Sequence, residues 1–256
     1  MHVATPTLNR IVRILQCQQS TFPQVYLGLP LSNVKLNLAT FAPLICKVDR
    51  RLASWQASLL NHHGRLVLIN SVLDGLVNYM MQALPLPPGI ISTIDSRRRA
   101  FLWTGTDKTN GAKCLVSWEV AQRPKREGGL GVRDLSTHNA CLLLKLLHRL
   151  HHPEDLAWVA WARRSTDMVT LKGLADGNHW EGLWALLPAY RCITRVQVGN
   201  GTSTSFWWDS WLGAFTIAAK FPCLLSHSTN TDASVQQILQ LGISNNLTAR
   251  LSLQAT

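Results

Sequence analysis

The chain has 256 residues and a mass of 28.5 kDa, enough for one large domain or two small ones. Hydrophobic residues make up 46% of it and charged residues only 15%. This composition excludes a disordered chain and indicates either a surface that lies against a partner or a piece of a larger protein. No apolar run reaches the roughly 18–20 residues that a membrane-spanning helix needs. The six cysteines are scattered, without the spacing of a disulfide framework or a zinc module.

The net charge of +11 is concentrated in the first three-fifths of the chain. Residues 1–150 contain 18 Lys and Arg against 7 Asp and Glu, whereas residues 151–256 contain 7 of each kind. A one-sided basic region is typical of a protein that binds a polyanion, with nucleic acid as the first candidate and an acidic membrane surface as the second. A basic face that only aids solubility is the alternative.

The first elements that the pattern predicts are a short strand and a long helix. Residues 26–31 (YLGLPL) are apolar, follow Phe22-Pro23 and have Pro30 at their end, which predicts the strand. From Thr40 to residue 59, apolar side chains recur at three- and four-residue steps, which predicts a helix with one apolar face and Thr40 as its N-cap. Lys47, Arg50 and Arg51 lie outside that face.

Two further helices complete a predicted bundle. Residues 64–84 are apolar almost all round, so this helix is expected at the centre, and prolines end it. The next helix, around residues 91–102, carries Arg97, Arg98 and Arg99 in succession. Because consecutive helical residues point about 100° apart, these side chains are expected to form a broad cationic arc on the outer side. Short connections favour antiparallel packing of these helices.

The remainder is predicted to be helical with one late hairpin. Residues 124–131 (PKREGGLG) predict a sharp basic turn, and residues 142–150 predict a leucine-rich helix. A following helix carries Trp158 and Trp161. Residues 196–207 alternate around a Gly-Asn-Gly turn, which predicts a β-hairpin.

The sequence shows no constellation of catalytic residues. Metal-dependent chemistry on phosphodiesters needs paired carboxylates, and the acids of residues 1–150 are isolated from one another. His148, His151 and His152 have a spacing that could present two metal ligands on one helix face. No third ligand with a recognisable spacing accompanies them, so we interpret them as a basic helix end.

Tryptophans gather beside the predicted late hairpin. Trp207, Trp208 and Trp211 could stack on unpaired bases, as in proteins that bind single-stranded nucleic acid. Stacking surfaces usually lie in basic grooves, however, and the local net charge here is near zero. Packing in a core or an interface is therefore the favoured interpretation.

Six sequence segments, taken in order, resemble one protein family. They are residues 17–31 (CQQSTFPQVYLGLPL), 47–55 (KVDRRLASW), 64–73 (GRLVLINSVL), 98–103 (RRAFLW), 123–135 (RPKREGGLGVRDL) and 198–212 (VGNGTSTSFWWDSWL). The series is similar to the C-terminal half of plant LINE-type (non-LTR) retrotransposon reverse transcriptases, over roughly residues 15–228. Each segment alone is weak, whereas six in the right order at compatible spacing are specific.

The resemblance implies roles for the basic residues. A YLG segment that looks like the primer-grip strand follows the catalytic palm in that family, and here it is Tyr26, Leu27 and Gly28. The helices after it resemble the thumb, which holds the primer–template duplex by its backbone. The resemblance gives phosphate contacts to Lys47, Arg50, Arg51, Arg65, Arg97, Arg98 and Arg99. The basic turn adds Lys125 and Arg126 as further candidates for phosphate contact.

The departures from the family decide the expected activity. The family's palm carries a Tyr-x-Asp-Asp box and another Asp before the YLG strand, but only 25 residues precede Tyr26 here and none is acidic. The endonuclease domain and the Cys/His zinc-binding module of the family are also missing from this sequence. The resemblance therefore implies a fragment without catalytic residues and without the ligands for the Mg²⁺ that the family uses, and it implies a nuclear location.

We thus predict a mainly α fold in four parts. These are the end of a palm with its strand (1–31), a thumb-like helical bundle (32–112), a helical connector (113–165), and a Trp-rich hairpin segment with its tail (166–256). The expected activity is at most sequence-independent binding of RNA or an RNA–DNA duplex through backbone phosphates, without catalysis and without a cofactor. The absent palm is a second possible partner, and no membrane is expected.

Two alternatives stay open. The first is a retroelement relic without a function, whose thumb helices expose the apolar face that a palm once covered. The second is a protein-interaction module that uses the neutral, Trp-rich second half.

Overall fold

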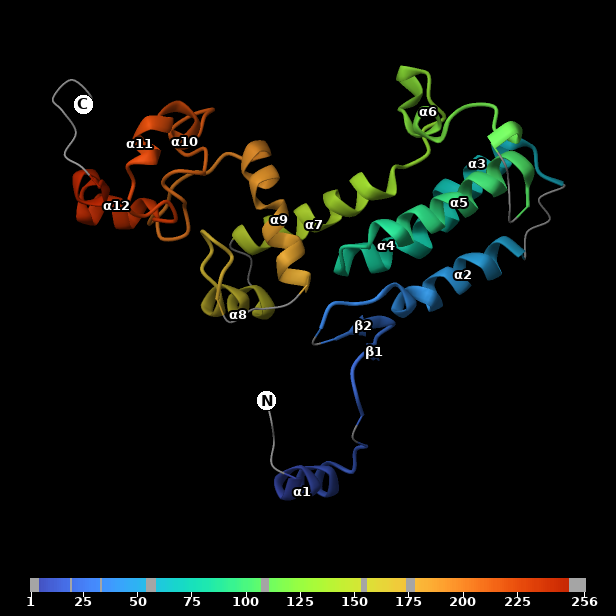
Figure 1. Cartoon of the computed structure of the whole chain (residues 1–256), viewed down its shortest axis with the longest axis horizontal. Coiled ribbons are helices and arrows are strands. Elements are labelled where there is room, and N and C mark those ends of the chain that lie inside the picture. The colour runs from blue at the N-terminus through green and yellow to red at the C-terminus, as the bar shows by residue number, and fades with distance from the viewer. Residues whose placement is uncertain are drawn as a thin grey trace.

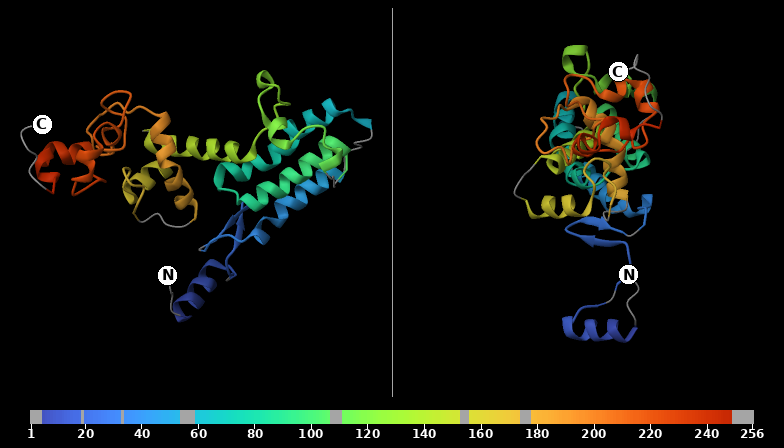
Figure 2. Two further views of the ribbon diagram at one scale, coloured as in Figure 1. Left: turned by 45° about the horizontal axis from the view of Figure 1, so that its top comes forward. Right: turned by 90° about the vertical axis from the view of Figure 1, so that its left-hand side faces the viewer.

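The computed structural model describes residues 5–18, 20–32, 34–53, 59–106, 111–152, 156–173 and 178–248. Over these ranges the chain is mainly helical, as predicted, and has a single two-stranded sheet. Figures 1 and 2 show an elongated molecule in which α7 leads from a helical bundle to the C-terminal elements, while α1 projects from the body. None of the described helices combines the length and apolar character that spanning a membrane requires.

The N-terminal elements are a helix and a hairpin. Helix α1 (Thr5–Leu15) has no buried residue. Strands β1 (Gln24–Tyr26) and β2 (Leu29–Leu31) pair antiparallel, with Leu27 and Gly28 at φ +51° and +82° between them. Positive φ at both central residues is the geometry of a two-residue hairpin turn. The prediction of one strand over residues 26–31 is therefore wrong, because the chain reverses inside the YLG segment.

The turn between β1 and β2 contacts a helix that lies later in the chain. The Tyr79 hydroxyl donates a hydrogen bond to the Leu27 carbonyl oxygen at 2.6 Å. A Cβ at Gly28 would lie 3.8 Å from the ring of Tyr79, so the turn packs on this tyrosine. The pattern of apolar residues does not encode such a contact from a helix that lies about fifty residues further along the chain.

Four helical segments in chain order form the bundle. They are η1 with α2 (Leu38–Phe41 and Ala42–Ala53), α3 (His62–Leu68) with the π-helical turn η3 (Ile69–Leu73), α4 (Asp74–Ala83), and α5 (Pro88–Thr104). Asn37, rather than Thr40, caps η1, because its Oδ1 accepts a hydrogen bond from the Thr40 amide at 2.9 Å. The predicted helix over residues 40–59 is described as far as Ala53, and its residues 54–58 lie outside the described ranges.

The helix predicted at the centre of the bundle is confirmed there. Together α3, η3 and α4 bury a row of side chains along nearly their whole length. The fully buried side chains of this first core include Phe41, Val48, Ile69, Leu73, Val77, Met81, Ile94, Phe101 and Leu102. A helix that is apolar on most sides has to be covered by neighbours on most sides, and α2, α5 and α7 provide that cover.

A long helix connects the bundle to a second core. Short elements precede it: η4 (Gly111–Lys113), α6 (Trp118–Gln122) and η5 (Lys125–Glu127). Helix α7 (Leu135–His151) then places Leu135 in the first core and Leu143, Leu147 and Leu150 in the second, which α8 (Ala157–Ser165) and α9 (Asn178–Ile193) complete. The leucine-rich helix is thus confirmed. The predicted domain boundaries after residues 31, 112 and 165 stay predictions.

The C-terminal part forms a third core from short elements. They are α10 (Ile217–Lys220), α11 (Pro222–Ser226), α12 (Val235–Leu241) and η6 (Ile243–Asn246). Trp207 is fully buried there, and Trp211 packs against Phe206 while its indole N–H donates to the Phe206 carbonyl at 3.0 Å. Core packing of these two tryptophans is therefore confirmed.

The late hairpin predicted over residues 196–207 is wrong. The segment forms bends, and its backbone pairs with a distant part of the chain instead of with itself. The Phe206 amide donates to the Ala233 carbonyl at 3.0 Å, and the Val235 amide donates to the Thr204 carbonyl at 2.9 Å. Local turn residues therefore predicted a reversal, while the hydrogen bonds of this segment are satisfied by tertiary contacts.

Candidate nucleic-acid interface

One side of α2 is basic and exposed. Arg50 and Arg51 lie three and four residues after Lys47, so each of them neighbours Lys47 on the helix surface. Leu44 and Val48 anchor a different side in the first core. All three cationic residues are exposed, and Arg51 also takes part in an interaction within the chain. The packing of the leucine and valine thus fixes which side of α2 carries the cations.

The acidic residue of α2, Asp49, forms an ion pair with an arginine of a neighbouring helix. Asp49 forms an ion pair with Arg97 of α5, and the Arg97 Nη2 donates to Asp49 Oδ2 at 3.1 Å. Arg97 Nη1 also donates to the Thr93 carbonyl at 3.2 Å. Arg97 is thus held toward α2 by groups of the protein. The charge of Asp49 is compensated by this pair, so it does not compensate Lys47 and Arg50.

Arg98 corrects the expectation of a cationic arc. Its side chain has 0% exposure and lies among Asp74 of α4, Asp95 of α5 and the Arg133 carbonyl. The distances are 3.0 Å from Nη2 to Asp74 Oδ1, 2.6 Å from Nη1 to Asp95 Oδ1, and 3.0 Å from Nη2 to the carbonyl oxygen. A guanidinium enclosed in this way does not contact a phosphate, and Arg98 is a structural residue.

The acids around Arg98 titrate unusually because they are buried. Burial raises the pKa of Asp74 to about 6, while the charges of Arg98 and Arg133 act in the opposite direction. Burial also raises the pKa of Asp95, against the charge and the hydrogen bond of Arg98. Removal of a carboxylate from water disfavours its charged form, and the nearby arginines offset only part of that cost.

Arg99 and Arg65 are half-buried. The Arg99 guanidinium lies 5.6 Å from the centroid of the Trp118 ring, at the same distance as that of Arg98, so Arg99 makes a cation–π contact with α6. Arg65 on α3 takes part in an interaction within the chain. The three arginines of α5 therefore have three different environments and do not form one exposed arc, and the phosphate roles of Arg65, Arg97 and Arg99 stay predictions.

The basic turn is built on glycines. A Cβ at Gly129 would lie 2.0 Å from the Arg123 carbonyl oxygen, so a side chain there would clash, and Gly128 has φ +80°, at which a side chain would be strained. The turn presents Lys125 and Arg126 to solvent, and Arg126 Nε lies 3.3 Å from Glu127 Oε1. The structure does not bring this turn and the basic side of α2 together by any described contact.

The primer-grip-like residues lie at the tip of the hairpin. Tyr26 and Leu27 are exposed, and Gly28 packs on Tyr79. Large apolar side chains are exposed along the whole segment: Phe22, Val25, Tyr26, Leu27, Leu31, Val34 and Leu38. Such a run is unusual for a free surface of a monomer.

Sequence reasoning missed one further basic surface. Lys145 and Arg149 lie four residues apart on α7 and are exposed, and His148 and His152 are exposed beside them. The signal was present in the pattern, because these positions alternate with the leucines that fill the second core. His151 differs from them: its ring nitrogens face the carbonyls of Leu147 and Met168 at 3.0 and 3.2 Å.

Burial also changes the acid–base equilibrium of His151. It lowers the pKa of His151, against the hydrogen bonds to the two carbonyls. Within the described part of the chain, no group of three or more His, Cys, Asp or Glu side chains could hold a metal ion.

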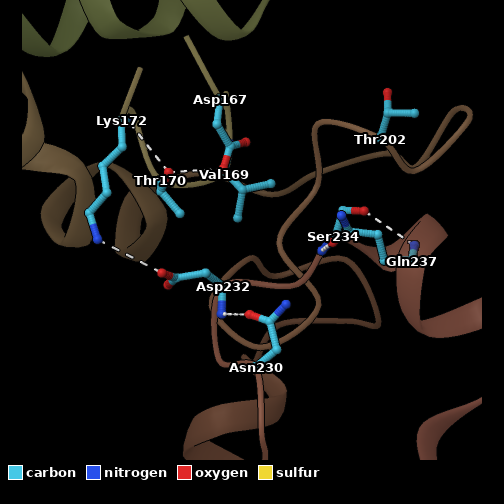
Figure 3. A pocket seen from close by; sticks show the side chains of 9 residues that line it. All are labelled: Asp167, Val169, Thr170, Lys172, Thr202, Asn230, Asp232, Ser234 and Gln237. Carbon is cyan, nitrogen blue, oxygen red and sulfur yellow. Dashed lines mark hydrogen bonds and ion pairs between the residues drawn. The ribbon is translucent and has the colours of Figure 1, made fainter. Parts of the chain in front are cut away.

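A polar cavity of about 310 Å³ lies between the second and third cores (Figure 3). Its lining consists of Asp167, Val169, Thr170, Lys172, Thr202, Asn230, Asp232, Ser234 and Gln237. The Asp167 carboxylate accepts hydrogen bonds of 2.9 Å from the Val169 amide and the Thr170 hydroxyl, and Lys172 Nζ lies 3.9 Å from Asp232 Oδ2. Its charged groups are thus engaged with neighbours and join the two cores.

Comparison with known proteins gives two relatives. The chain is 28% identical over 192 residues to a protein of Arabidopsis thaliana named "Putative ribonuclease H protein", a match that covers 72% of this chain and 31% of that protein. It is 22% identical over 139 residues to an "Uncharacterized mitochondrial protein" of the same plant, covering 52% of this chain and 90% of that protein. The chain thus spans less than a third of the first relative. No protein-family model and no solved structure matches it.

Proposed function

We propose that this chain binds RNA or an RNA–DNA duplex through backbone phosphates, without regard to sequence. The observation that carries the proposal is the exposed basic side of α2, which contains Lys47 and Arg50. The acidic residue beside them, Asp49, forms an ion pair with Arg97. The concentration of the whole net charge in residues 1–150 supports it independently. Phosphate contacts need no special base geometry, so a row of exposed cations on a rigid helix is sufficient.

The proposed origin is a retrotransposon reverse transcriptase, with α2 to α5 as its thumb. The six segments in family order support this origin, and the name of the first relative refers to an enzyme that acts on RNA. The proposal assigns no catalysis to this chain and a nuclear location to it. Template-directed nucleotide incorporation by the pure chain would contradict the first of these statements.

The test is binding of the full chain to a fluorescent RNA–DNA hybrid over a salt series. Log affinity is expected to fall linearly with log salt concentration, by roughly one unit of slope for each phosphate neutralised. The variant Lys47→Glu/Arg50→Glu is expected to bind more weakly, with a slope that is shallower by about 2. The control Arg195→Glu/Lys220→Glu makes the same charge change at exposed positions of the neutral half and is expected to keep the parent slope. Equal slopes for both variants would contradict the proposal.

One observation favours a second candidate function. The exposed apolar residues between Phe22 and Leu38 are suited to docking against a further domain, such as the palm of the parent family. This candidate predicts binding of a hydrophobic dye by the pure chain, and a clear loss of dye fluorescence in Val25→Thr/Leu27→Asn. Unchanged dye binding in that variant would exclude the hairpin as the docking surface.

A further inference from the structure

Helix α8 carries two exposed tryptophans on one side. Trp158 is 41% exposed and Trp161 is 61% exposed, and their three-residue spacing places the two rings next to each other on the helix surface. Val159 and Ala162 are buried on another side, and Ala162 packs in the second core. Tryptophan is a costly side chain to leave in water, so an exposed pair indicates a surface that binds something.

The helix itself carries a positive charge. Arg163 and Arg164 form the last turn of α8, which contains no Asp or Glu, and Arg164 is exposed three residues after Trp161. Among the described residues neither arginine forms an ion pair. The remaining exposed positions of this side are Ala157 and Ala160. Alanines leave the faces of the two rings open, whereas a helix that docks on a protein core usually presents large aliphatic side chains.

We propose that α8 binds single-stranded nucleic acid, with bases stacked on Trp158 and Trp161 and a phosphate contacted by Arg164. Flat aromatic faces next to a cation are the combination by which proteins hold unpaired strands without reading their sequence. The proposal rests on the proposed function only for the class of ligand. Its surface is a different one, because α8 packs into the second core and α2 into the first (Figures 1 and 2).

The test compares a fluorescent single-stranded oligouridylate with the RNA–DNA hybrid, both measured with the full chain. Trp158→Ala/Trp161→Ala is expected to weaken single-strand binding roughly tenfold or more and to leave hybrid binding within about twofold. Trp158→Phe/Trp161→Phe retains two aromatic faces and is expected to recover most of the affinity. Trp184→Ala is the matched control, because Trp184 is 55% exposed on α9 and has Glu181 in the same helix.

The outcomes separate this inference from the duplex proposal. Loss of single-strand binding in the alanine variant, with recovery in the phenylalanine variant, supports α8 even if the α2 variant leaves hybrid binding unchanged. Single-strand binding that is equal in the parent and the alanine variant overturns the inference. An equal loss with Trp184→Ala, or an equal loss for the hybrid, also overturns it. Protein partners captured by α8 while single strands are ignored would assign the surface to protein docking instead.

Discussion

At the scale of single residues, the three arginines of α5 show how far neighbours in sequence can differ in role. Arg97 reaches α2, Arg98 is enclosed between α4 and α5, and Arg99 lies on Trp118. Helix geometry sends the three side chains in different directions, and each of them also meets a partner in another element: Asp49 of α2, Asp74 of α4 and Trp118 of α6. The acids that look isolated in the sequence, Asp74 and Asp95, converge on Arg98 only after folding.

The first residue-scale prediction concerns Arg98. Arg98→Met is expected to lower the free energy of unfolding by about 3–5 kcal/mol, because it leaves the buried Asp95 without its cation and Asp74 with only the more distant Arg133. Arg97→Met, at a partly exposed pair, is expected to cost about 1 kcal/mol or less. Urea denaturation of both variants and the parent measures the difference. Equal costs for the two variants would mean that Arg98 is not the centre of a buried ion cluster.

The second residue-scale prediction concerns the pH dependence of the free energy of unfolding. Burial raises the pKa of Asp74 to about 6, from 3.8 for an ordinary aspartate. Between about pH 4 and pH 6, the Asp74 carboxyl group therefore keeps its proton in the folded state, whereas in the unfolded chain it has lost it. The stability contributed by this group is present below about pH 4 and is lost as the pH rises through about 6.

The comparison of Asp74→Asn with the parent tests this assignment. The free energy of unfolding of the variant is expected to fall less than that of the parent between about pH 4 and pH 7. Asp95, whose pKa burial also raises, is present in both proteins, but its charge raises the pKa of Asp74, so the difference reports Asp74 together with its coupling to Asp95. Parallel pH profiles of the two proteins, obtained from urea denaturation, would contradict the assignment.

At the scale of elements, a single buried amide of α7 contacts the end of α4 and the turn that follows it. Asn139 Oδ1 accepts a hydrogen bond from the Leu86 amide at 2.7 Å. Its Nδ2 donates to the Met81 and Leu84 carbonyls at 2.7 and 3.0 Å. These three groups belong to the end of α4 and the turn before α5, where helix geometry leaves backbone groups without partners. Asn139 thus ties α7 to the end of α4 and to the turn that follows it.

Asn139→Ala is expected to lower the free energy of unfolding by at least about 2 kcal/mol, because several buried backbone groups lose their partner. Cys141→Ala, at an exposed position of the same helix, is the control and is expected to be nearly neutral. Thermal and urea unfolding measure both. A neutral Asn139→Ala would show that water or backbone adjustment satisfies these groups.

The elements that the sequence predicts well are helices whose apolar pattern repeats over several turns. The helices at residues 64–84 and 142–150 repeat their apolar positions over several turns, and the structure has both. Turn residues predict the hairpins poorly, because a few of them do not specify which segments pair. The Leu27-Gly28 turn lies inside a segment whose pattern predicts one strand, and the Gly199–Gly201 turn predicts a local pairing that residues 233–235 provide instead. The partner of Asn139 is equally invisible in the sequence, because it is a tertiary contact.

At the scale of the whole molecule, the described elements form successive cores, and the excess of basic residues lies in the first three-fifths of the chain. Within the described residues, the buried side chains gather in three successive clusters along an elongated body (Figures 1 and 2). The Arg191 guanidinium joins the last two, since it donates to Asp209 Oδ1 at 3.0 Å and to the Val169 carbonyl at 2.6 Å. The basic charge was readable from composition. The sequence does not indicate that α2, rather than α5, exposes its basic side chains, because burial in the folded structure decides this.

The most direct test of the account is lysine footprinting by mass spectrometry, with and without bound RNA–DNA hybrid. The account predicts that Lys47 on α2 reacts several-fold more slowly with an amine-modifying reagent when the hybrid is bound, because a phosphate covers its ammonium group. Lys220 on α10, exposed in the neutral half, is expected to react at an unchanged rate. Unchanged reactivity of Lys47 under conditions in which the hybrid is fully bound would contradict the account.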